Sequence, residues 1–194
     1  KTIITCMNYG DSLFEEKTVE TVEGCFSPPE NTSVSWINID GLHDSSVITK
    51  IGERYAVHPL ILEDILTTDQ RPKIEEYDNF LFIVLRMITF DEKEYIINAE
   101  QGSMVLMKDR LITFQEKEGD VFGIIRERIR NNKGKIRKMG ADYLGYSLID
   151  AIVDGYFVVL DKIGEEIDEI EENLLTAKSS NESLMDIHEL KREM

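Results

Sequence analysis

The hydrophobic positions divide the chain into a mixed N-terminal region and a helical C-terminal region. Apolar and β-branched residues are concentrated in two runs, 2–9 and 31–41, which predicts a strand in each. Residues 47–57 instead carry apolar side chains three or four positions apart, and the polar segment 44–46 before them can cap a helix. Pro59 can occupy the first turn of a second, short helix, which should end before the next proline.

Four further runs of β-forming residues follow, separated by short turns. Links this short join antiparallel neighbours, so we expect a meander of strands in the segments 72–79, 80–91, 94–109 and 110–117. The pattern becomes helical from Asp120, with one helical stretch up to Gly140, a long helix from Ala141 to Leu175 and another from Glu182. Apolar residues of the long helix alternate by threes and fours, as in a helix packed along another helix: Leu160, Ile163, Ile167, Ile170 and Leu174.

Helices, an antiparallel-rich sheet and then long helices amount to an α+β fold with a helical extension. The 194 residues are 42% hydrophobic and 31% charged, which is enough for a globular domain with its own core. Asp and Glu outnumber Lys and Arg by 38 to 22, and the net charge is −16. A surface this acidic repels nucleic acid and attracts cations, so we expect no nucleic-acid partner.

The cysteines and the ends of the chain add three expectations. Cys6 and Cys25 form neither a CxxC pair nor a metal-spaced set with histidine, so we expect reduced thiols. No run of 18 apolar residues occurs, which predicts no transmembrane helix. The chain begins at Lys1 and closes at Met194 inside a helical pattern, which is typical of a fragment of a longer protein.

Acidic side chains are the only abundant chemical groups. Glu63 and Asp64 are neighbours in an otherwise apolar helical segment, and Asp150 and Asp154 lie four residues apart on one helix face. Carboxylates without histidine or cysteine suit a hard cation such as Mg²⁺ or Ca²⁺, and Mg²⁺ needs only one or two of them. Alternatively, both pairs are helix-surface acids or salt-bridge partners, because structural ion pairs have the same sequence pattern.

A third acidic group lies along the long helix. We interpret it as the solvated flank of a coiled coil, although crowded carboxylates repel and would be steadied by divalent ions or by a facing basic element. The basic run from Arg126 to Lys138 is one candidate for that element. The acidic run consists of Asp161, Glu165, Glu166, Asp168, Glu169, Glu171 and Glu172.

The sequence disfavours an enzyme. None of the motifs GxSxG, HExxH, GxGxxG or the P-loop occurs. The three histidines are scattered, and His58 before Pro59 is most simply a helix-entry residue. Neither a base and nucleophile nor a set of oxyanion donors can be recognised.

Six motifs, in order over nearly the whole chain, resemble the cytoplasmic domain of CorA-type magnesium/cobalt channels. They are WINIDGLH, HPLILEDIL, QRPKIEEYDNFLFIVLRM, FQEKEGDVF, RERIR and DYLGYSLIDAIVDGYF. The resemblance implies a homopentamer whose subunits each have a cytoplasmic α/β/α domain, a long stalk helix and two membrane helices with a Gly-Met-Asn signature. This chain lacks the membrane helices and the signature. We therefore expect the cytoplasmic portion of an inner- or plasma-membrane protein, which alone pentamerises weakly or not at all.

The resemblance also implies how the chain is divided. Residues 1–140 would form an α/β/α sandwich around a largely antiparallel sheet. Residues 141–178 would form the long acidic helix, packed on the domain and on a helical partner. Residues 181–194 would begin the stalk helix, which is truncated here.

The resemblance further implies regulatory metal sites between neighbouring subunits. By motif match, Asp64 is the main ligand with Glu63 beside it, while Asp150 and Asp154 face the same interface and the neighbour's stalk supplies a further acid. The implied function is a divalent-cation-sensing domain, in which Mg²⁺, or Co²⁺ or another divalent cation in its place, stabilises the closed channel. One alternative is a structural oligomerisation module with no metal role, and a metal-dependent hydrolase is a poorer one.

Overall fold

The computed structural model describes residues 2–91 and 95–176, which belong to two compact units. Unit 1 comprises Lys1–Met87 and Ala99–Ile152, and unit 2 comprises Ile88–Asn98 and Val153–Met194. The expected start of a stalk helix at 181–194 lies outside the described residues.

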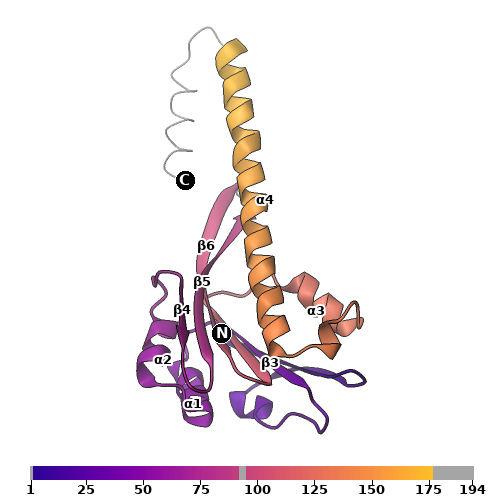
Figure 1. Cartoon of the computed structure of the whole chain (residues 1–194). Helices are drawn as coiled ribbons and strands as arrows, with labels where there is room; N and C mark the ends of the chain where they lie inside the picture. The colour runs from indigo at the N-terminus through magenta and orange to yellow at the C-terminus, as the bar shows by residue number, and fades with distance from the viewer. Residues whose placement is uncertain (1, 92–94, 177–194) are drawn as a thin grey trace. The chain divides into compact units, whose positions relative to one another are not determined.

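Seven strands form one sheet in the order β2-β1-β3-β7-β6-β5-β4 (Figure 1). Strand β1 pairs antiparallel with β2 and β3, as do β4 with β5 and β6 with β7, whereas β3 and β7 are parallel. The predicted meander of β4 to β7 is confirmed, but β2 and the parallel pair were not predicted. The strands are β1 Ile3–Tyr9, β2 Phe14–Val19, β3 Val34–Asp40, β4 Lys73–Glu76, β5 Leu81–Asp91, β6 Ile96–Leu106 and β7 Arg110–Gln115.

The helices agree with the sequence pattern except between Asp120 and Gly140. Asn132 and Gly134 adopt positive φ angles of 49° and 71°, a left-handed conformation that cannot continue a helix. The predicted helical stretch is therefore wrong there, and it is replaced by a short α3, a turn and a 3₁₀ segment. The helical elements are η1 Val22–Cys25, α1 Ser45–Tyr55, α2 Pro59–Leu66, α3 Gly123–Arg130, η2 Ile136–Lys138 and α4 Ala141–Thr176.

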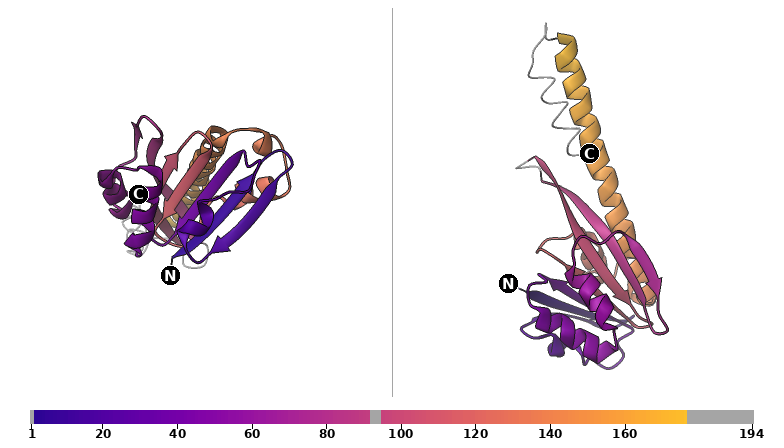
Figure 2. Two further views of the ribbon diagram at one scale, coloured as in Figure 1. Left: turned by 90° about the horizontal axis from the view of Figure 1, so that it is seen from below. Right: turned by 90° about the vertical axis from the view of Figure 1, so that its left-hand side faces the viewer.

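Helices cover both faces of the sheet in unit 1, because successive strand residues point to opposite faces. Ile37 and Ile39 of β3 belong to a core shared with α1 and α2, which lie side by side (Figure 1 and Figure 2). Trp36 points to the other face, where its ring lies edge-on to Phe122 at the start of α3, with centroids 6.1 Å apart. Unit 1 is therefore the largely antiparallel α/β/α sandwich that the resemblance implied.

Helix α4 begins in unit 1 and continues in unit 2. Its first turns bury Ala141, Leu144 and Leu148 in the core of unit 1. Within unit 2, partial desolvation and the charge of Glu166 on α4 raise the pKa of Tyr95, which precedes β6. Tyr95 therefore lies near Glu166 in the second half of α4.

Length and composition mark one helix of the described residues as able to cross a membrane. It is the segment Ala141–Asn173 of α4, whose apolar window has a mean hydropathy of 1.4. A third of that window, 33%, is buried inside the structure. A core helix of a soluble protein can meet the same criterion. The first turns of α4 are buried, whereas Phe157, Val158 and Leu160 farther along are exposed.

Candidate divalent-cation site

Helix α2 carries the first acidic pair, and its start is fixed by local chemistry. The His58 Nδ1 atom accepts a hydrogen bond from the Leu60 backbone N–H at 3.2 Å, and Pro59 occupies the first helical turn. This confirms the interpretation of His58 as a helix-entry residue. Ile61 and Ile65 are buried and attach the helix to the core.

The two acids of α2 differ in their surroundings. Glu63 is exposed, whereas Asp64 is half-buried with 27% of its side chain accessible. Not all apolar neighbours of this pair are in the core, since Leu60 is 64% exposed. Helix α2 therefore has a solvent-accessible face, and both carboxylates can be reached from outside unit 1.

Asp64 is paired with Lys73 of β4. The Lys73 Nζ atom lies 2.6 Å from Asp64 Oδ2 and 2.9 Å from Glu75 Oε1, and the pKa of Lys73 is raised by hydrogen bonds to these two carboxylates. On the backbone side, Gln101 Nε2 donates to the Asp64 carbonyl oxygen at 3.1 Å. The Lys73 ammonium group therefore already contacts the Asp64 carboxylate, which the family resemblance implies to be a metal ligand.

A groove runs between α1 and α2, next to the acidic pair. Its volume is about 620 Å³, and Glu53 and Glu63 are the charged residues of its lining. The two helices approach closely at Gly52, where a Cβ atom would overlap the side chain of Leu62. Glu63 therefore borders an open groove, whereas Asp64 is held against β4 by Lys73.

The second pair, Asp150 and Asp154, lies on α4. Both side chains are exposed, one helical turn apart, as their spacing predicted. Asp150 belongs to unit 1 and Asp154 to unit 2.

The acidic run lies farther along α4, in unit 2. Six of its seven side chains are exposed, and Glu166 is half-buried. Lys162 Nζ pairs with Glu165 Oε2 at 2.7 Å, which compensates one of the charges locally. The run consists of Asp161, Glu165, Glu166, Asp168, Glu169, Glu171 and Glu172.

The carboxylates do not form a complete metal centre within the described part of this chain. Among residues 2–91 and 95–176, no three His, Cys, Asp or Glu side chains converge closely enough to hold a metal ion. Carboxylate oxygens are suitable ligands for a hard cation, but too few of them lie together at any one place to complete its coordination. A cation held here would need further ligands, either water or groups from outside this part of the chain.

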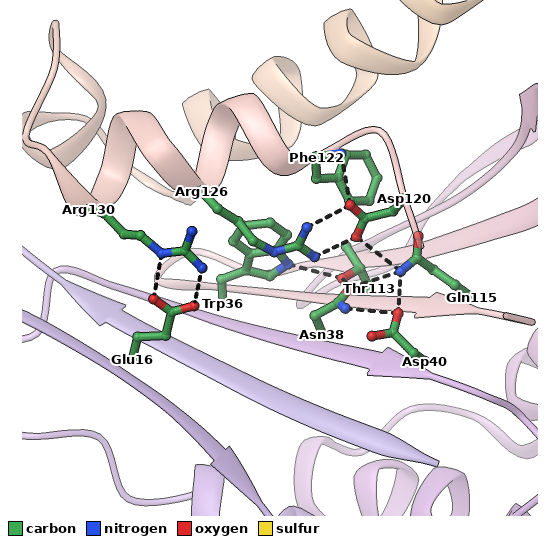
Figure 3. A network of polar contacts seen from close by, with 10 residues as sticks. All are labelled: Glu16, Trp36, Asn38, Asp40, Thr113, Gln115, Asp120, Phe122, Arg126 and Arg130. Carbon is green, nitrogen blue, oxygen red and sulfur yellow. Dashed lines mark hydrogen bonds and ion pairs between the residues drawn. The ribbon is translucent and has the colours of Figure 1, made fainter. Parts of the chain in front are cut away.

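The sequence did not reveal a polar network between α3 and the sheet (Figure 3). Arg126 of α3 makes a two-point ion pair with Asp120 and lies over the Trp36 ring, 5.0 Å from its centroid. Asp120 Oδ1 also accepts the Phe122 backbone N–H at 2.9 Å, which fixes the chain entering α3. Because the Asp120 side chain is only 4% exposed, this pair is shielded from water.

The network continues across β3 and β7 (Figure 3). Gln115 Nε2 donates to Asp40 and, at 3.2 Å, to Asp120 Oδ2, and Thr113 Oγ1 donates to Asn38 Oδ1 at 2.6 Å. Desolvation raises the pKa of Asp40 in this setting. The polar side chains thus connect the parallel strand pair to α3.

The network also shows what part of the basic run does. Arg130 holds Glu16 of β2 through two contacts of 2.7 Å, and Arg137 donates to the Ile129 carbonyl oxygen at 2.6 Å. With Arg126, three cations of this run therefore bind partners inside unit 1. The idea that the run steadies the acidic part of α4 remains a prediction.

Comparisons with known proteins give one consistent family. The model of the family described as CorA-like Mg²⁺ transporter protein matches residues 31–194. The chain is 47% identical over 191 residues to the cobalt/magnesium transport protein CorA of Thermotoga maritima, covering 98% of this chain and 54% of that protein. It is 26% identical over 136 residues to the magnesium transporter ALR1 of Saccharomyces cerevisiae, covering 70% and 16%. The chain therefore spans about half the length of the first of these relatives and less of the second.

Solved structures share the fold. The soluble domain of CorA from Methanocaldococcus jannaschii matches with a TM-score of 0.73 and 17% identity, covering 98% of this chain and 70% of that one. The complete CorA magnesium transporter of the same organism gives a TM-score of 0.71 and 19% identity, covering 95% and 55%.

Proposed function

Because the chain belongs to the CorA-like Mg²⁺ transporter family, we propose that it is the cytoplasmic cation-sensing domain of such a transporter. Cytoplasmic Mg²⁺, or Co²⁺ or another divalent cation in its place, binds at subunit interfaces and stabilises the closed state of a homopentamer. Transport itself belongs to the part of the protein that this chain does not contain.

The observation that carries the proposal is the exposure of carboxylates in sets too small to hold a metal alone. Glu63 and Asp64 on α2 are accessible from outside unit 1, and so are Asp150 and Asp154 on α4. Such half-sites are complete only when a neighbouring subunit contributes further oxygen ligands. This arrangement couples cation binding to subunit contact, which is what a sensor of cation concentration requires.

The free energy that cation binding can contribute is large enough for regulation. A site contributes RT ln(1 + [L]/Kd), about 1.4 kcal/mol at a cation concentration tenfold above Kd. Five equivalent interfaces would sum to about 7 kcal/mol, enough to move a closed–open equilibrium across its useful range. When the cation concentration falls, facing carboxylates repel one another and the interfaces loosen.

One observation favours the alternative of an oligomerisation module with no metal role. The Lys73 ammonium group lies 2.6 Å from Asp64 Oδ2 and neutralises its charge. A purely structural ion pair therefore also explains why an acid stands at position 64. Under our proposal, Lys73 instead competes with the cation. It lowers the affinity of the site, so that the site responds to high rather than trace cation concentrations.

Protection from proteolysis in the full-length protein separates the two functions. We expect Mg²⁺ to slow cleavage of the wild type, and Asp64→Asn with Asp150→Asn to abolish that protection. A matched control is Asp78→Asn with Asp142→Asn, which removes the same charge at two exposed acids outside the proposed sites. Protection that persists in the Asp64/Asp150 variant would favour the oligomerisation module.

A further inference from the structure

A buried amide of β6 contacts the end of α2. Gln101 is only 1% exposed, and its side chain makes three hydrogen bonds within unit 1. Its Nε2 atom donates to the Asp64 carbonyl oxygen at 3.1 Å and to Ser103 Oγ at 3.2 Å, and its Oε1 atom accepts the Gln70 backbone N–H at 3.0 Å. Because a backbone carbonyl only accepts and a backbone N–H only donates, a single orientation of the amide satisfies both partners.

The bond to Asp64 stabilises the last turn of α2. Carbonyl groups in the last turn of a helix have no partner inside that helix. Gln101 supplies the partner from β6, at the residue of α2 that is also the main proposed ligand. With only eight residues, α2 is too short to hold its own end by helix formation alone. The position of the Asp64 carboxylate therefore depends on this contact as well as on the packing of the helix.

The bond to Gln70 holds the chain that leads to Lys73. Gln70 lies between α2 and β4, three residues before Lys73, at which β4 begins. The Lys73 ammonium group lies 2.6 Å from Asp64 Oδ2, and under the proposed function it competes with the cation for that carboxylate. The Gln101 amide therefore binds both the residue that carries the acid and the segment that carries its competing cation.

The backbone of Gln101 is fixed as well. Strand β7 ends at Gln115, which pairs with Gly102 of β6. Beyond that pair a side chain holds β6, because Glu116 Oε1 accepts the Gln101 backbone N–H at 3.0 Å. The amide that contacts α2 is thus itself held in place, as an outer residue must be if it is to orient a ligand.

We propose that Gln101 is a positioning residue of the cation site and sets the Mg²⁺ concentration at which the site responds. The inference rests on the proposed function, because it takes Asp64 as a cation ligand. Removal of an outer contact that orients a metal ligand costs about 10–100-fold in metal affinity. A looser Lys73 would compete less with the cation, but that gain is only about two- to fivefold. Loss of the Gln101 amide should therefore weaken Mg²⁺ binding.

The test variant is Gln101→Met, which keeps an unbranched side chain of similar size and removes the amide. Ile61 and Ile65 remain buried, so α2 should still form. In the full-length protein, we expect the Mg²⁺ concentration for half-maximal protection from proteolysis to rise about tenfold. Gln115→Met is the matched control, because Gln115 is also 1% exposed and its amide binds Asp120, away from α2. Both variants should lower the urea midpoint of unfolding, but only Gln101→Met should move the Mg²⁺ midpoint.

Hydrogen exchange of the Gln70 backbone amide tests the contact without any cation. Gln70 lies outside the helices and strands, and its N–H donates to Gln101 Oε1. We expect slow exchange of this amide in the full-length wild type and rapid exchange in Gln101→Met, read from overlapping peptides by mass spectrometry. Rapid exchange in the wild type would overturn the inference, and this result holds even if Gln101→Met does not fold.

The Mg²⁺ midpoints separate failure of this inference from failure of the proposed function. An unchanged or lower midpoint in Gln101→Met, with the response lost in Asp64→Asn with Asp150→Asn, would overturn the inference and leave the proposed function standing. Equal shifts in Gln101→Met and Gln115→Met would also overturn it, because they would report lost stability alone. If the Asp64/Asp150 variant keeps the Mg²⁺ response, the proposed function fails and the inference fails with it.

Discussion

Replacement of Lys73 by methionine should increase the affinity of the Asp64 site for Mg²⁺. The substitution removes the ammonium group that contacts Asp64 at 2.6 Å and Glu75 at 2.9 Å. It keeps an unbranched stem of similar length, which can still pack beside the Phe82 ring near which Lys73 lies. Asp64 then loses the ammonium group that competes with a divalent ion.

The magnitude follows from the exposure of the pair. The side chains of Lys73 and Asp64 are 28% and 27% accessible, so water screens their attraction. An ion pair of this kind contributes about 0.5–1 kcal/mol. Its removal should therefore lower the Mg²⁺ concentration for half-maximal effect about two- to fivefold. In the absence of Mg²⁺, the variant should be less stable by the same small free energy.

The assay is the Mg²⁺ concentration that gives half-maximal protection of the full-length protein from proteolysis. Lys17→Met is a matched control, because Lys17 also pairs with a carboxylate of its own unit, Glu15 at 3.5 Å, away from α2. A variant at position 73 that needs the same or more Mg²⁺ than the wild type would refute competition between Lys73 and the cation.

Three further predictions concern unit 1. Asp120→Asn leaves the guanidinium of Arg126 without its buried partner and should lower the free energy of unfolding by about 2–4 kcal/mol, measured by urea titration with Trp36, the single tryptophan, as the fluorescent reporter. Gly52→Ala forces Leu62 to move while gaining helix propensity, and calorimetry should show a net loss of about 1 kcal/mol. Desolvation raises the pKa of Asp40, so the folded chain binds that proton at higher pH than the unfolded chain. The stability due to this group should therefore rise as pH falls from the raised pKa towards the ordinary value, and Asp40→Asn should remove that rise in urea titrations at several pH values.

Local sequence signals were sufficient to predict the first two helices, α1 and α2. Asp44 accepts the Ser46 backbone N–H at 3.1 Å, and His58 with Pro59 begins α2, as capping rules predict from the sequence alone. The meander was equally accessible, because each turn is short enough to define its two neighbours.

Long-range pairings were not accessible in this way. Strand β2 has the sequence FEEKTV, whose charged residues conceal the alternation expected of a strand, and only pairing with β1 defines it. The parallel contact of β3 with β7 joins segments more than 70 residues apart. By contrast, the break after α3 had a local signal in Asn-Asn-Lys-Gly at 131–134, because Asn and Gly tolerate positive φ.

The candidate site likewise combines residues that the sequence identified with a contact that only the fold revealed. The four carboxylates were selected from residue type, spacing and resemblance. In the structure Glu63, Asp150 and Asp154 are exposed and Asp64 is half-buried, while their role as ligands stays a prediction. Lys73, the cation beside Asp64, was missed because α2 and β4 meet only in the fold. Nothing in the motif QRPK marks this lysine as a partner rather than as a solvated surface residue.

Direct counting of bound Mg²⁺ tests the central claim most closely. Equilibrium dialysis of the full-length protein should show regulatory Mg²⁺ that is lost in the variant Asp64→Asn with Asp150→Asn. The charge-matched variant Asp78→Asn with Asp142→Asn should retain it. An unchanged number of bound ions in the first variant would contradict the assignment of these carboxylates as the cation sensor.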